Sequence, residues 1–149
     1  MRPAADRGST LILGLGLVVV CVLAGVVAID VGAAHLQRRN LLALADAAAL
    51  AGAQAIDLDA YYRDGASAAT ALDARSVPVL VRRHLAATLA QGSPASVAIE
   101  RIAADADEVV VRLSVPLDVP LWRAAAGAVL GERVVVEAHA RLAYREAGP

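Results

Sequence analysis

The chain contains no lysine, no phenylalanine and only one cysteine, and these shortages limit the fold and the function that it can have. A single cysteine cannot form a disulfide within the chain, so a disulfide-stabilised fold is excluded. All of the basic residues are arginines, and acidic residues offset them to a net charge of -1, so no basic field favours nucleic acid. The missing residues, beside abundant alanine and valine, indicate the coding bias of a high-GC, actinobacteria-like genome.

The usual motifs of enzymes and metal sites are also missing. Three histidines lie far apart without a zinc-binding pattern: His35, His84 and His139. Gly14 and Gly16 lie within an apolar run, so they do not form a phosphate-binding loop, and no Gly-x-Ser-x-Gly elbow occurs. Three aspartates lack the spacing of a calcium loop: Asp57, Asp59 and Asp64. We therefore expect no enzyme activity, no cofactor, no metal and no small-molecule substrate.

The most distinctive segment of the sequence is the apolar run Leu11–Ile29. It holds 19 residues without a charge or a proline, which is close to the length that a helix needs to cross a bilayer. A cleaved signal peptide is the alternative, with small-residue cleavage sites such as Gly32-Ala33-Ala34, but its apolar part is usually shorter. The sequence therefore predicts a single transmembrane helix.

Basic residues flank the run on both sides and do not decide its orientation. Arg2 and Arg7 precede it, and Arg38 and Arg39 follow it. The short N-terminal tail and its free amine favour a cytoplasmic N-terminus. We expect a single-pass protein of the cell membrane whose C-terminal domain is extracytoplasmic.

A cleavage signal is suggested just before the apolar run. Gly8 followed by Ser9 lies at the boundary of a basic tail and an apolar helix, where prepilin peptidases cut. The alternative is that both residues form a turn and a helix N-cap. Cys21 follows Val18-Val19-Val20 rather than a small residue, so a lipoprotein signal is excluded and Cys21 is expected to face lipid or another helix.

Several features in a fixed order resemble a known family. They are Arg7-Gly8-Ser9, Leu11–Ile29, Asp30-Val31-Gly32, Leu36–Arg39 and Ala45–Ala53. Together they make residues 7–55 similar to the TadE/TadG-like proteins of the tight-adherence (Flp) pilus. The resemblance implies a pseudopilin-like protein whose partners are the lipid bilayer, other pilin or pseudopilin subunits and membrane proteins of the Tad machinery. It also implies that Asp30, Gly32 and Asp46 belong to a family motif used in assembly.

One departure from the pilin pattern narrows this expectation. Pilins carry a glutamate five residues into the mature chain, whereas counting from Ser9 places Leu13 there. The resemblance therefore implies an accessory component, or minor pilin, rather than the main subunit.

The region after the span is expected to continue it as one long helix from Leu11 to Ala55, because alanine is a strong helix former. Small side chains there would allow close approach of another helix or of the chain's own sheet. The apolar stripe is expected at four positions with helical spacing: Leu36, Ala43, Ala47 and Leu50. Asp30 marks the end of the span or forms an ion pair, and Asp46 faces solvent or a neighbouring subunit.

The rest of the chain predicts a small α+β domain with a short antiparallel sheet. A helix is expected over Val77–Gln91, with Val81, Leu85 and Leu89 on its apolar face. Three strands are expected: Ser96–Ile102, Glu108–Val115 and Arg133–Tyr144. On the middle strand, Arg112 and Ser114 are expected on one face and the valines on the other. A short helix is expected over Leu121–Leu130, opened by Pro120, ended by Gly131 and anchored in the core by Trp122.

The expected organisation has five parts. They are a cytoplasmic tail or leader at 1–10, the transmembrane helix at 11–29, its helical extension at 30–55, a linker at 56–75 with Tyr61 and Tyr62 as packing residues, and the extracytoplasmic domain at 76–149. The leading hypothesis is a structural component of a Flp/Tad pilus or a related secretion machinery. The alternatives are a single-span or secreted binding module of the cell envelope, and a tethered regulator of an unrelated secretion system.

Overall fold

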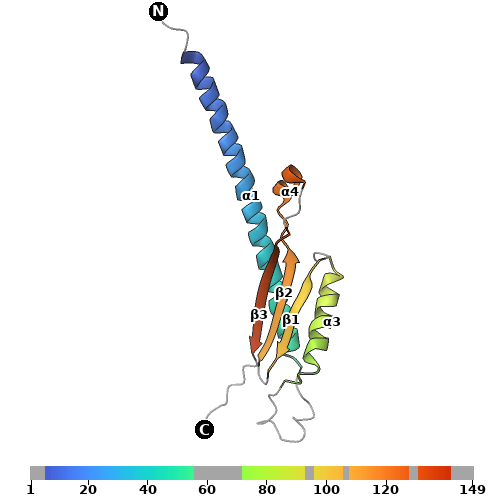
Figure 1. Cartoon of the computed structure of the whole chain (residues 1–149). Helices are drawn as coiled ribbons and strands as arrows, with labels where there is room; N and C mark the ends of the chain where they lie inside the picture. Colours follow the sequence, from blue (N-terminus) through green and yellow to red (C-terminus); the bar gives the residue numbers. More distant parts are fainter. Residues whose placement is uncertain (1–5, 56–71, 93–95, 106–107, 128–130, 142–149) are drawn as a thin grey trace, which may run out of the picture. The chain divides into compact units, whose positions relative to one another are not determined.

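A computed structural model describes residues 6–55, 72–92, 96–105, 108–127 and 131–141. In chain order the elements are α1 (Asp6–Gly52), α3 (Val77–Leu89), β1 (Ala98–Ala104), β2 (Glu108–Pro116), α4 (Pro120–Ala126) and β3 (Arg133–Arg141) (Figure 1). A long apolar N-terminal helix precedes a small domain with a three-stranded antiparallel sheet, so the predicted α+β fold is confirmed.

The chain divides into two compact units. One unit comprises Met1–Leu36 and Asp118–Leu130, and the other comprises Gln37–Leu117 and Gly131–Pro149. Helix α1 contributes to both units, and α4 belongs to the first. The domain bounds expected from the sequence stay predictions.

Helix α1 contains 47 residues without a break. At about 1.5 Å per residue it is roughly 70 Å long. It begins at Asp6, earlier than the predicted Leu11, and it continues through Gly32 to end at Gly52. Its apolar part makes it the one helix, within the described residues, that is long and apolar enough to cross a membrane.

The sheet has the order β1-β2-β3, and both strand pairs are antiparallel. Val111 of β2 lies opposite Ile102 of β1 and Ala138 of β3, which fixes the register of the inner face. A bulge between Ile99 and Arg101 interrupts the first pairing. The predicted first strand is displaced toward the C-terminus, and the end of the predicted third strand, with Leu142 and Tyr144, lies outside the described residues.

The core of the second unit lies between α1, α3 and one face of the sheet. Alternate residues of β2 are fully or almost fully buried: Val109, Val111, Leu113 and Val115. Helix α3 adds Val77, Val81 and Leu85. The predicted alternation of β2 and the predicted apolar face of α3 are thus confirmed at these positions, while Leu89 is only half-buried.

The apolar stripe expected on α1 is wrong. Leu36 is 59% exposed and Leu50 is 61% exposed. A different face of the helix is buried: Leu41, Ala45, Ala48, Ala49 and Ala53. Alanine and leucine occur around the whole circumference of this part of α1, so helical spacing alone does not select the face that meets the sheet.

The start of α3 is stabilised by Asp73, just before the helix. Its carboxylate accepts a hydrogen bond from the Ser76 hydroxyl and another from the backbone N–H of Arg75, at 3.0 Å. These two bonds favour the ionised carboxylate and lower the pKa of Asp73. Pro78 lies in the first turn, where its missing N–H costs nothing.

Candidate functional site

The apolar part of α1 is exposed along its length. Every residue from Thr10 to Gly25 is exposed, and the large side chains in this stretch retain between 49% exposure, at Val19, and 76%, at Leu13. Contiguous apolar surface on this scale marks contact with a membrane or with another protein. Exposure of this part of the helix to water is therefore energetically unfavourable.

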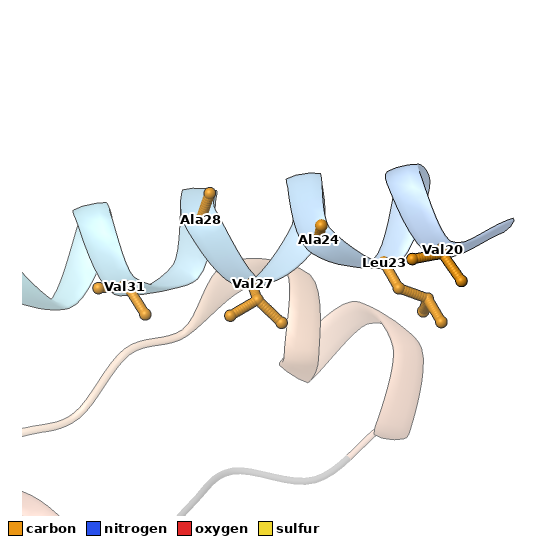
Figure 2. Close-up of a pocket in the computed structure, with 6 residues that line it drawn as sticks. All are labelled: Val20, Leu23, Ala24, Val27, Ala28 and Val31. Carbon is orange, nitrogen blue, oxygen red and sulfur yellow. The ribbon is translucent and has the colours of Figure 1, made fainter. Parts of the chain in front are cut away.

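This surface is uneven because small residues alternate with large ones. One hollow is lined by Val20, Leu23, Ala24, Val27, Ala28 and Val31 (Figure 2). A second hollow, closer to the N-terminus, is lined by Ile12, Leu13, Gly16, Leu17 and Val20. Small residues at such positions let another helix, or lipid chains, approach the backbone closely.

Asp30, the first charged residue after the apolar run, binds the N-terminus of α4. Its Oδ1 accepts a hydrogen bond from the backbone N–H of Leu121, and its Oδ2 accepts one from that of Trp122, both at 3.0 Å. The N-cap position of α4 is occupied by Val119, whose side chain cannot accept a hydrogen bond. Asp30 therefore supplies the cap from a distant part of the chain, a contact that the sequence did not reveal.

Helix α4 is shorter than predicted, and its end differs. It stops at Ala126 because Gly127 adopts a left-handed conformation with φ of 63° and donates its N–H to the Arg123 carbonyl. Gly131 therefore does not end it. Trp122 is 50% exposed, so its predicted role as a core anchor is wrong. Arg123 forms an ion pair with Asp118 at 2.8 Å.

The remaining residues of the predicted motif lie on α1. Gly8 and Ser9 lie in its first turns, and Gly32 and Asp46 are exposed along it. A Cβ atom at Gly32 would meet nothing within 4 Å. The leader cleavage site and the assembly roles of Gly32 and Asp46 stay predictions.

The alanine-rich end of α1 packs within its own unit. Its small residues allow close approach, and at Gly52 an added Cβ atom would lie 2.8 Å from Val81, 3.1 Å from Val109 and 3.3 Å from Val77. Ala45, three and four residues before further buried alanines, lies on the same face. This face meets both α3 and the chain's own sheet. The sequence had predicted that its small side chains would allow close approach of another helix or of this sheet.

Comparison with known families identifies this N-terminal part of the chain. Residues 8–55 match the family described as putative Flp pilus-assembly TadE/G-like. The region is TadE/G-like. The resemblance predicted for residues 7–55 is thereby confirmed, and the match supports a pilus-related function. Neither the search of curated proteins nor the search of solved structures found a match.

The TadE/G-like region contains the apolar surface, Asp30 and the packed alanine face. Its match ends at Ala55, and α1 ends at Gly52. The family region thus coincides with α1 and the turn that follows it. The sheet, α3 and α4 lie outside the match.

Outside the TadE/G-like region, the outer face of the sheet carries charged residues. Glu108 accepts hydrogen bonds from Arg141 at 3.2 Å, and His139 lies 3.1 Å from the same carboxylate. The hydrogen bond from Arg141, followed by that from His139, lowers the pKa of Glu108. His139 also approaches Glu137 at 3.2 Å, and Glu137 lies 3.8 Å from Arg112.

Ser114 differs from the expectation for this face. It lies beside Arg112 on the same strand as predicted, but it is fully buried. Its hydroxyl donates to Glu100 and accepts hydrogen bonds from Arg133 Nε at 3.0 Å and Nη2 at 2.8 Å. The long side chains of the two neighbouring strands cover it. Within the described residues, no group of three or more His, Cys, Asp or Glu side chains could hold a metal ion.

Proposed function

We propose that the protein is a membrane-anchored, pseudopilin-like accessory component, or minor pilin, of a Flp/Tad pilus or a related secretion machinery. The observation that carries the proposal is the TadE/G-like match at residues 8–55. That match contains both the exposed apolar surface and the packed alanine face of one helix. The role is structural, and it is exercised through helix packing.

The chemistry of α1 supports the proposed membrane anchor. Each large aliphatic side chain moved from water into an apolar medium contributes about 1.5–3 kcal/mol. Nineteen residues from Leu11 to Ile29 carry no charge that would oppose this transfer. The backbone hydrogen bonds of a helix are satisfied internally, as hydrocarbon requires. We assign the N-terminus to the cytoplasm and the sheet to the outside.

The proposed partners are other pilin or pseudopilin subunits and membrane proteins of the Tad machinery. Gly16, Ala24 and Ala28 leave hollows on the exposed surface into which a neighbouring helix can pack. Leu13 lies where pilins carry a glutamate whose carboxylate pairs with the amino terminus of a neighbouring subunit. This favours an accessory position over that of the main subunit.

Photo-crosslinking tests this assignment. A photoreactive residue at Ala24 of the full chain, expressed with its native machinery, is expected to capture a pilin or a Tad membrane protein that mass spectrometry identifies. The control position is Val79, which is 64% exposed on α3. Capture from Val79 alone, or no pilus component from Ala24, would contradict the proposal and favour an envelope-binding module.

Processing by a prepilin peptidase is a separate part of the proposal. The mature chain is expected to begin at Ser9, and Gly8→Leu is expected to block cleavage while Gly14→Leu does not. Mass spectrometry of the N-terminus measures this. A chain that retains Met1 would contradict cleavage but keep the anchor, whereas one that begins near Ala34 would indicate an ordinary signal peptide and remove the anchor.

A further inference from the structure

We infer that α4 is a membrane-contacting element, which inserts Leu121 and Trp122 into the outer headgroup region of a bilayer beside the end of the transmembrane helix. The inference rests on the proposed membrane anchor. It adds a second lipid contact, outside the TadE/G-like match, to a chain whose sequence indicates a single span.

The position of α4 follows from its hydrogen bonds to Asp30. Asp30 directly follows the apolar run, and its carboxylate binds the N–H groups of Leu121 and Trp122 at 3.0 Å each. The first turn of α4 therefore lies where the proposed span meets the headgroups. Both segments belong to the same compact unit.

The residues of α4 suit an interface between water and lipid. Trp122 is 50% exposed, and tryptophan is enriched at the level of the headgroups. Leu121 and Ala124 are also accessible to the surroundings. The charge of Arg123 is paired with Asp118 at 2.8 Å, and its aliphatic stem can lie in apolar surroundings while its head reaches the polar layer.

The dimensions and the backbone of α4 also agree with a shallow insertion. Seven residues make a helix of about 10 Å, and interfacial helices bury their apolar face by about 5–10 Å. Unpaired backbone N–H groups are costly near hydrocarbon. Asp30 satisfies two of those at the start of α4, and Gly127 donates its own N–H back to Arg123 at 3.0 Å.

Lipid is favoured over a protein occupant because α4 begins beside Asp30, where the exposed apolar surface of the span ends. On α1, the large residues just before Asp30, such as Val27 and Ile29, are exposed, and lipid covers them if the span is in a bilayer. A helix held to this surface by Asp30 meets the same lipid without any change in the fold.

Trp122 permits a direct test because it is the single tryptophan of the chain. The full chain is reconstituted into vesicles of phosphatidylcholine and phosphatidylglycerol, and tryptophan emission is measured with brominated lipids and with aqueous iodide. Lipids brominated near the headgroup are expected to reduce the emission about twofold, and iodide is expected to have little effect. Strong iodide quenching without bromolipid quenching would overturn the inference. Protection from both quenchers would also overturn it, because it would indicate a protein occupant.

Two matched variants test the part played by Asp30. Asp30→Ala removes the cap and is expected to lower the bromolipid quenching, whereas Asp46→Ala, an exposed position on the same helix, is expected to leave it unchanged. Unchanged quenching in Asp30→Ala would contradict positioning by Asp30. Alkaline extraction of the same vesicles separates the two proposals. Release of the wild-type chain would contradict the anchor, whereas a retained chain with iodide-accessible Trp122 would contradict only the inference.

Discussion

Gly52 lies so close to Val81 that a Cβ atom at position 52 would stand 2.8 Å from Cγ2 of the valine. Real Cβ atoms do not tolerate that distance, and Val109 and Val77 close the space from two other directions. The end of α1 therefore needs a residue without a side chain. This requirement gives the last part of the alanine-rich motif a reason inside the fold itself.

Gly52→Ala is expected to destabilise the sheet unit by about 1–3 kcal/mol, because an added methyl group overpacks a closed core. The matched control is Gly32→Ala on the same helix, where an added Cβ meets nothing within 4 Å. This control is expected to be neutral, or to stabilise the helix by up to about 1 kcal/mol. Thermal unfolding of the full chain in detergent, followed by circular dichroism, measures both. Equal unfolding temperatures for the two variants would contradict the close packing at Gly52.

Ser114→Ala is expected to cost about 1–2 kcal/mol, because Glu100 and Arg133 each lose a hydrogen-bond partner at a buried position. Ser96→Ala, at an exposed position before β1, is the control and is expected to be neutral. The free energy of unfolding in denaturant distinguishes the two variants. A neutral Ser114→Ala would contradict a stabilising role for the hydrogen bonds of this hydroxyl.

Acid is expected to destabilise the protein in part through Glu108. Its pKa lies below the usual 4.5, first because of the hydrogen bond from Arg141 and then because of that from His139. A carboxyl group whose pKa is lowered by folding stabilises the protein above its unfolded pKa, and this contribution is lost as the pH falls through the lowered value. Glu108→Gln is therefore expected to weaken the pH dependence of the unfolding temperature below about pH 5.

The control for this measurement is Glu132→Gln, which removes one exposed carboxyl group outside the strands. It changes the net charge by the same amount without removing the contact with Arg141. If both variants shift the acid part of the profile equally, the effect belongs to overall charge and not to the Glu108 contacts.

Features set by local pattern were predictable from the sequence. Val109 and Val111 are buried, and the residues that alternate with them, Glu108, Val110 and Arg112, are half-buried or exposed, so the middle strand and its buried face followed from spacing alone. The apolar run likewise predicted a long N-terminal helix. On α1 the same method selected the wrong face, because Leu36 and Leu50 fit the helical period as well as Leu41 does.

Features set by distant contacts were not predictable. The cap that Asp30 supplies to Leu121 joins residues that are 91 positions apart, and nothing near either residue indicates the other. Ser114 is buried because Glu100 and Arg133 reach over it from two neighbouring strands. The exposure of Trp122 depends on where the short helix lies rather than on its own sequence.

The packing of Gly52 against Val109 also sets an order of events during synthesis. Val109 is made 57 residues after Gly52, which takes several seconds at about 5–20 residues per second. During that interval the face of α1 with Ala45 and Ala48 has no sheet to cover it. Methyl groups expose little apolar surface. An alanine-rich face is therefore less prone than a leucine-rich one to associate wrongly before its strand is synthesised.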